Sequence, residues 1–171
     1  MGGEPHFLGA CFASVLMVSD LTPNVGLFWY IFIEVFDRFR QLFLVVFHGH
    51  LLFHSWPLHF RVGRHLPVGP WLHCFAAIGI IALFKPYPTA ADHALMLAAL
   101  LIPSELVKES DKSFVFLLVG QFFGLSMFPT MRAVWLGRNA GNANFLYNMT
   151  LVTVVFGSLL LSGWATSVCA H

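Results

Sequence analysis

The chain has 171 residues, of which 58% are hydrophobic and only 10% charged, whereas soluble domains carry about 25% charged residues. With 19 phenylalanines and a mean hydropathy of +0.77, it has more apolar surface than a soluble domain of this size could bury. The composition therefore predicts an integral membrane protein. The net charge of +1 argues against a nucleic-acid partner, which requires a clustered basic face.

The N-terminal residues 7–18 are mostly apolar. Their number, about twelve, suits the core of a signal peptide better than a complete membrane span. No basic residues precede them, since the chain opens with Gly2, Gly3 and Glu4. We interpret the segment as the tail of a helix whose beginning is missing, as in a fragment of a longer chain.

Residues 25–56 form a long apolar region with four charges between Glu34 and Arg40. As one helix it would be about 48 Å long, which exceeds the roughly 30 Å of the hydrocarbon core. Two arrangements fit. Either residues 27–39 lie partly in the interface and residues 41–56 cross, or one tilted helix carries its charged turn beyond the bilayer. Both place the charges near the lipid headgroups.

Breakers divide the remaining chain. Pro57 and the basic residues 59–70 predict a polar loop, and Pro86 and Pro88 forbid a continuous helix around Tyr87. Residues 71–103 are therefore expected to form a helical hairpin, and a re-entrant second arm also fits. Residues 104–113 and 132–143 are expected to form loops. The expected membrane segments are residues 41–56, 71–84, 91–102, 114–131 and 145–164. The fold class is all-α: a polytopic membrane helix bundle of about five spans plus the partial first one, forming a single transmembrane domain over residues 1–171.

Three stretches resemble one family in the same order and at about the same spacing. They are LTPNVGLFWYIFIEVFDRF at residues 21–39, ALFKPYPT at residues 82–89 and GNANFLY at residues 141–147. The family is the U subunit (PIG-U) of the glycosylphosphatidylinositol (GPI) transamidase, which attaches GPI anchors to proteins in the endoplasmic reticulum. The resemblance covers the C-terminal part, less than half, of the usual family chain.

The resemblance implies a GT-C-like, noncatalytic, multi-pass subunit without cofactors. Such a subunit helps bind or present the GPI lipid and holds other subunits, among them PIG-T and the caspase-like subunit that cleaves the peptide bond. The sequence itself contains no Ser-His-acid or Cys-His pairing in a recognisable context, which agrees with a noncatalytic role.

Two alternatives remain open. A GT-C-type mannosyltransferase would carry acidic catalytic residues in an early lumenal loop, and this chain has no such loop. A His-box lipid-modifying enzyme is the weaker alternative. His50 and His54 have a metal-ligand spacing, and His73 and His93 could add ligands from other segments. The chain has no adjacent His-His pair, so we expect unliganded histidines and no metal.

The charged turn gives one set of candidate residues. On a continuous helix, Glu34 and Arg38 would be i,i+4 neighbours, and Asp37 would lie near Arg40. They are either an ordinary helix-end cluster of ion pairs or a polar ledge that contacts headgroups or a partner subunit. Asn24 and Trp29, in the same segment, are candidates for the headgroup boundary.

The second set precedes the last apolar segment. The amides of Asn142 and Asn144 can both donate to and accept from sugar and phosphate oxygens. Asn144 could instead serve as a helix N-cap, which also favours a phosphate. Phe145 and Tyr147 could form the floor of a lipid site.

Overall fold

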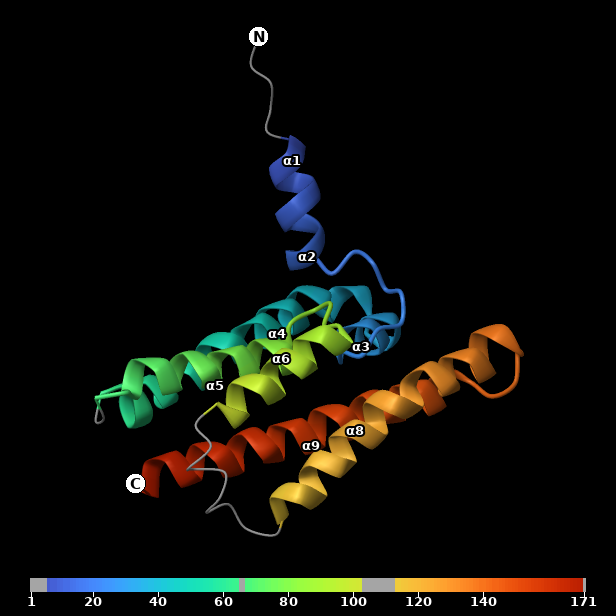
Figure 1. Cartoon of the computed structure of the whole chain (residues 1–171). Coiled ribbons are helices and arrows are strands. Elements are labelled where there is room, and N and C mark those ends of the chain that lie inside the picture. Colours follow the sequence, from blue (N-terminus) through green and yellow to red (C-terminus); the bar gives the residue numbers. More distant parts are fainter. Residues whose placement is uncertain (1–5, 65–66, 103–112, 171) are drawn as a thin grey trace.

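A computed structural model describes residues 6–64, 67–102 and 113–170, and every regular element within these ranges is helical (Figure 1). The expectation of an all-α chain is confirmed. Most helices lie alongside one another in an elongated bundle, and a short N-terminal helix stands at an angle to it.

The N-terminal helix consists of α1 (His6–Leu8), the π-helical turn η1 (Gly9–Ala13) and α2 (Ser14–Leu16). Its last carbonyls are bound by side chains of α4 (Asp37–Leu58). Arg40 Nη2 donates to the carbonyl oxygens of Val18 at 2.7 Å and Met17 at 3.1 Å. His48 Nε2 lies 2.8 Å from the carbonyl oxygen of Leu16. These bonds satisfy a helix C-terminus that would otherwise leave acceptors unpaired.

The long apolar region contains two helices rather than one. α3 (Phe28–Glu34) ends at Val35, and Val35 and Phe36 are extended, with ψ of 136° and 140°. The prediction of one tilted helix over residues 25–56 is therefore wrong. The physical reason is packing: Phe28 and Phe32 are buried against Leu44 of α4, and α3 reaches that position only by folding back beside α4.

The loop predicted from residue 59 begins later than expected. α4 continues through Pro57, and the π-helical turn η2 extends it from His59 to Gly63. The N–H of His59 bonds to the carbonyls of both Ser55 and Trp56. Pro57 lies in the last turn of α4, and the helical path continues past it into η2.

The hairpin prediction for residues 71–103 is confirmed for its described part. α5 (Gly69–Phe84) and α6 (Ala90–Leu101) pack together on either side of a nonhelical link. A capping box holds the start of α6, with the Thr89 N–H 2.7 Å from an Asp92 carboxylate oxygen. Lys85 forms a 2.7 Å salt bridge to the same carboxylate. The link is thus fixed at both of its ends.

The C-terminal part is a helical pair, formed by α8 (Ser113–Arg132), its π-helical extension η3 (Ala133–Gly137) and α9 (Ala143–Ala170). Gly124 permits a close approach, because a methyl group there would lie 2.8 Å from the backbone nitrogen of Thr153. Because η3 continues the helix to Gly137, the loop predicted from residue 132 begins only at residue 138.

Two helices in the described part of the chain are long and apolar enough to cross a membrane: Ser113–Gly137 and Ala143–Cys169, each with a hydropathy of 1.7. α5 and α6 are apolar but shorter. The structure thus supports two of the roughly five spans expected. Buried residues such as Leu83, Met96 and Leu160 join α5, α6 and α9 into one core.

Candidate functional site

Of the three stretches that carry the family resemblance, the first contacts each of the other two. The backbone N–H of Asp20 donates to the Tyr87 hydroxyl at 3.1 Å, which joins the segment before α3 to the α5–α6 link. A methyl group at Gly26 would lie only 2.5 Å from Pro88 Cδ. The chain before α3 therefore lies directly on the proline-rich link.

The second contact joins α3 to the beginning of α9 through four aromatic rings, which we call the aromatic corner: Trp29, Tyr30, Trp135 and Tyr147. Tyr30 and Tyr147 stack with centroids 4.4 Å apart. Trp29 and Tyr147 meet edge to face with ring centroids 5.8 Å apart, and Trp135 stacks on Trp29 with centroids 6.3 Å apart. The Tyr30 hydroxyl donates to the side-chain oxygen of Asn144. The corner thus combines ring faces with hydroxyl and amide groups.

The N-cap of α9 is Asn142 and not Asn144, which corrects the sequence interpretation. α9 begins at Ala143, and the side-chain oxygen of Asn142 accepts the backbone N–H of Asn144 at 3.0 Å. Asn144 is already within the helix, where its side chain binds Tyr30. Both asparagines are exposed. The cap uses the amide oxygen of Asn142, which leaves its two N–H donors for another partner.

The other predicted lipid residues are divided between roles. Trp29 is fully buried and Tyr147 half-buried within the corner. Asn24 is used by its own turn, since its oxygen accepts the N–H of Gly26 at 2.8 Å and its amide donates to the Thr22 carbonyl. Phe145 is 57% exposed, and no aromatic contact among the described residues includes it. The corner therefore unites Trp29, Asn144 and Tyr147, with Asn142 two residues away.

The predicted pairing of Glu34 with Arg38 is wrong. The helix break at Val35 and Phe36 separates them, and no ion pair joins them. Arg38 lies over the ring of Phe39 instead, 5.3 Å from its centroid. Glu34, Asp37 and Arg38 are all exposed, so they form a polar rim beside the corner without pairing.

Arg40 is a residue whose role the sequence interpretation missed. Besides bonding to two carbonyls of the N-terminal helix, its guanidinium lies 5.0 Å from the ring centroid of Phe32. It thereby ties α2, α3 and α4 together. A signal was present: Arg40 shares a helical face with Phe43 and Phe47, at i+3 and i+7.

Histidines in the described part of the chain lie in separate pairs. His50 Nδ1 and His54 Nε2 are 3.1 Å apart, and both rings stack on Phe84. His73 lies beside His59, and buried His93 pairs with Gln121 at 3.3 Å. Among the described residues, no three His, Cys, Asp or Glu side chains gather in a metal-binding arrangement.

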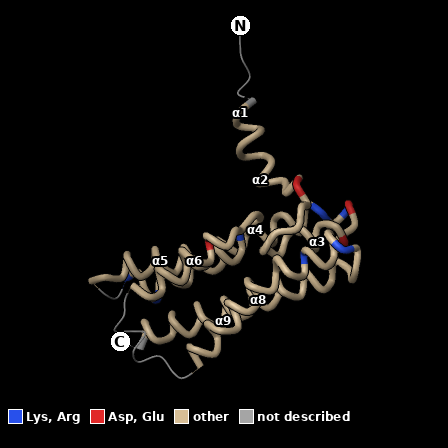
Figure 2. The backbone as a smooth tube through the Cα atoms, turned by 45° about the vertical axis from the view of Figure 1, so that its right-hand side comes forward, with Lys and Arg blue, Asp and Glu red and all other residues tan. Residues whose placement is uncertain are grey.

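Among residues 6–64, 67–102 and 113–170, charge is concentrated at the end of the bundle that holds α3 and the α8–α9 connection (Figure 2). Asp20 belongs to this end. Its carboxylate accepts the hydroxyl of Thr22 at 2.6 Å and the N–H of Thr22 at 2.8 Å. These bonds lower the pKa of Asp20, because they favour the ionised form. Within the described residues, the aromatic corner therefore lies at the most charged end of the bundle.

Comparison with known proteins gives a consistent result. Residues 1–153 match the family described as GPI transamidase subunit PIG-U. The chain is 35% identical over 158 residues to the human GPI-anchor transamidase component PIGU, covering 92% of this chain and 35% of that protein. It is 36% identical over 155 residues to the Schizosaccharomyces pombe GPI transamidase component GAB1 homolog, covering 90% of this chain and 36% of the relative.

A Saccharomyces cerevisiae relative, GPI transamidase component GAB1, is 29% identical over 161 residues, which are 93% of this chain and 40% of the relative. The chain thus spans about 35 to 40% of the length of these relatives. On the family match and on these identities, the chain belongs to the PIG-U family of GPI transamidase subunits.

Proposed function

We propose that this chain acts as a noncatalytic, multi-pass subunit of the GPI transamidase in the endoplasmic reticulum membrane, where it presents the GPI lipid and holds neighbouring subunits. The observation that carries the proposal is that the first family-like stretch contacts both of the others, the α5–α6 link through the segment before α3 and the start of α9 through the aromatic corner. The segments that meet are distant in the chain: Asp20 and Tyr87 are 67 residues apart, and Tyr30 and Asn144 are 114 residues apart.

The membrane arrangement we propose uses α4 as a third span. The 22 residues of α4 and the 5 of η2 make a helix of about 40 Å, enough to cross the roughly 30 Å core with some tilt. Asp37 and Arg38 lie at one end and Arg61 at the other, as expected for charges held in the interfaces. α5 and α6 then form a shorter hairpin beside it, within a GT-C-like bundle.

The chemistry of the aromatic corner suits a glycolipid headgroup. The amides of Asn142 and Asn144 can bond to sugar and phosphate oxygens, and the start of α9 favours a negative charge. Tyr30 and Tyr147 are partly exposed, so their rings can contact the apolar faces of sugars. The buried Trp29 packs against both tyrosine rings.

The polar rim of Glu34, Asp37 and Arg38 is the surface we propose for contact with other subunits. Its charges are exposed and unpaired with one another, so a partner can meet them without first breaking ion pairs among these three. The partners we propose are the caspase-like catalytic subunit and PIG-T. Catalysis is then supplied by the partner, and this chain contributes binding surfaces.

The experiment uses Asn142→Ser in the native cell. Serine keeps the capping oxygen but removes the two N–H donors. If these donors bind the GPI headgroup, anchor attachment to a reporter should fall about five- to tenfold, the equivalent of roughly 1 kcal/mol. Protein level and co-purification with the other subunits should stay normal. Asn148→Ser, on an exposed position of the same helix, is the matched control. Full anchor attachment in Asn142→Ser would contradict the headgroup role.

A further inference from the structure

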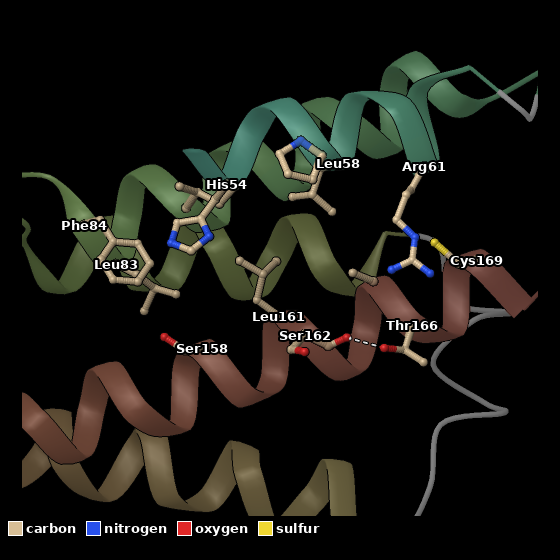
Figure 3. A pocket seen from close by; sticks show the side chains of 13 residues that line it. His54, Leu58, Arg61, Leu83, Phe84, Ser158, Leu161, Ser162, Thr166 and Cys169 are labelled. Carbon is tan, nitrogen blue, oxygen red and sulfur yellow. Dashed lines mark hydrogen bonds between the residues drawn. The ribbon is translucent and has the colours of Figure 1, made fainter. Parts of the chain in front are cut away.

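A pocket of about 440 Å³ lies between α4–η2, α5 and α9, in the half of the bundle away from the aromatic corner (Figure 3). One wall comes from residues spaced along α4 and η2, namely His54, Leu58 and Arg61. The facing wall carries a stripe of hydroxyl groups on α9 at i, i+4 and i+8: Ser158, Ser162 and Thr166.

The two ends of this pocket differ in chemistry. At one end, the Arg61 guanidinium points toward α9 beside Thr166 and Cys169 (Figure 3). Toward the other end the wall is apolar, formed by Leu83, Phe84 and Leu161, with His54 nearby. No carboxylate lines the pocket among the described residues. An elongated ligand with an anionic end and an apolar tail matches this polarity.

The hydroxyl groups of α9 follow the length of the pocket, from Ser158 near Leu83 to Thr166 near Arg61, with Ser162 between them (Figure 3). The Thr166 hydroxyl donates to the Ser162 carbonyl at 2.9 Å, which leaves its oxygen as an acceptor. Within the described part of the chain, no hydrogen bond uses the side-chain hydroxyls of Ser158 or Ser162. Those hydroxyls can donate to ester oxygens, which have no donor of their own.

We propose that this pocket binds a membrane glycerophospholipid. Arg61 binds the phosphate through its paired N–H donors, Ser162 contacts the glycerol ester region, and one acyl chain follows Leu58 and Leu161. A volume of about 440 Å³ falls within the roughly 300–1,000 Å³ usual for ligand pockets. It holds the phosphate, the glycerol and part of one chain.

The position of the pocket in the bundle agrees with this orientation of the lipid. η2 lies at the end of the bundle opposite α3 (Figure 1), so a phosphate on Arg61 would sit at an end of the spanning helices. The chain would then run toward the middle of the bundle, as it does in a bilayer. The site is separate from the aromatic corner, and its orientation in the bilayer rests on the membrane arrangement of α4 proposed above.

Cys169 provides a direct readout, since it is an exposed free thiol that lines the pocket beside Arg61. In the full chain carrying Cys11→Ser and Cys74→Ser, it is the sole thiol. The rate of its reaction with a maleimide is measured in detergent with added dioctanoyl phosphatidic acid. The parallel arms use dioctanoylglycerol, which lacks the phosphate, or inorganic phosphate alone.

We expect phosphatidic acid to slow the alkylation of Cys169, and the other two additives to leave it unchanged. Arg61→Gln should raise the half-protecting lipid concentration about tenfold, since it removes a charge-assisted bond. Arg64→Gln should have no effect, because Arg64 lies over the Phe60 ring and does not line the pocket. A variant that retains Cys74 alone controls for general detergent effects.

Ser162→Phe offers a second test from an exposed lining position. It should fill the pocket and abolish lipid protection even if Arg61→Gln folds poorly. Equal protection by dioctanoylglycerol would overturn the role of Arg61, and protection by inorganic phosphate would reduce the site to a small-anion site. Absence of protection by phosphatidic acid in the parent chain would overturn the proposal.

Discussion

Gly26 is where the contact between two of the family-like stretches can be broken by a single methyl group. In Gly26→Ala the new carbon would lie 2.5 Å from Pro88 Cδ, 2.6 Å from Pro88 Cγ and 2.9 Å from Asn24 Oδ1. Ordinary carbon contacts are about 3.5–4.0 Å, so the segment before α3 must move away from the α5–α6 link by about 1 Å. A proline ring is rigid and cannot rotate aside.

Overpacking of this kind costs about 1–3 kcal/mol. For a chain of this size, that corresponds to a fall in Tm of about 2–12 °C. The assay is thermal unfolding of the purified chain in detergent, followed by tryptophan fluorescence, since Trp29 is buried in the adjoining corner. Gly163→Ala is the control, because a methyl group there meets nothing within 4 Å and should be neutral or slightly stabilising.

The double variant Gly26→Ala/Pro88→Ala tests the contact itself. Pro88→Ala removes the ring atoms that the new methyl group meets, so the double variant should lose less stability than the sum of the single variants. The reasoning is refuted if Gly26→Ala unfolds like Gly163→Ala, or if the two changes at positions 26 and 88 add strictly.

Three further predictions follow from particular contacts. Arg40→Gln removes two charge-assisted bonds to the end of α2, which should reduce the free energy that holds this segment by roughly 1.5–3 kcal/mol. Limited proteolysis between residues 17 and 27 should therefore accelerate about tenfold or more. Cleavage at the parent rate would contradict the anchoring role. Tyr30→Phe removes the hydrogen bond to Asn144 and should lower the free energy of unfolding by about 0.5–1.5 kcal/mol. In an Asn144→Ala background the same substitution should have no effect on stability. An undiminished effect there would show that the Tyr30 hydroxyl acts through another group. His93 Nε2 and Gln121 Oε1 are buried without partners in the described structure. Changing both residues to leucine should therefore leave stability nearly unchanged, whereas His93→Leu alone should cost about 1–3 kcal/mol, because it leaves the buried Gln121 amide without its partner. A thermal unfolding scan in which the double variant is the least stable would contradict this prediction.

Much of the fold could be predicted because its signals are local. Apolar runs predicted the helices, and Pro86 and Pro88 marked the link between α5 and α6, as the structure has it. The break between α3 and α4 could not be predicted in this way. Val35 and Phe36 carry no helix-breaking signal, and they are extended because α3 must pack its phenylalanines on α4. A tertiary contact overrides local preference there.

The candidate site was predicted only in part, for a related reason. Trp29, Asn144 and Tyr147 were singled out as separate residues, but their contacts join helices distant in the chain. The cap is Asn142 rather than Asn144 because the side-chain oxygen of Asn142 accepts the Asn144 N–H, whereas the side-chain oxygen of Asn144 accepts the Tyr30 hydroxyl from α3. The spacing of Arg40 from Phe43 and Phe47 indicated that it lies on the packed face of α4, but its partners, the carbonyls that follow α2, are distant in the chain and could not be predicted from that spacing.

The most direct test of the central claim places a photoreactive group in the aromatic corner. The residue p-benzoyl-phenylalanine is introduced at Tyr147 in the gene's native cell, and radiolabelled GPI is crosslinked to the protein within its assembled complex. Phe122, which is 52% exposed on α8 outside the corner, provides a matched aromatic position. If the corner presents the GPI lipid, adducts should form from position 147 at several times the yield from position 122, and Asn142→Ser should reduce that yield. Equal yields from the two positions would contradict the assignment of the corner as the lipid-presenting site.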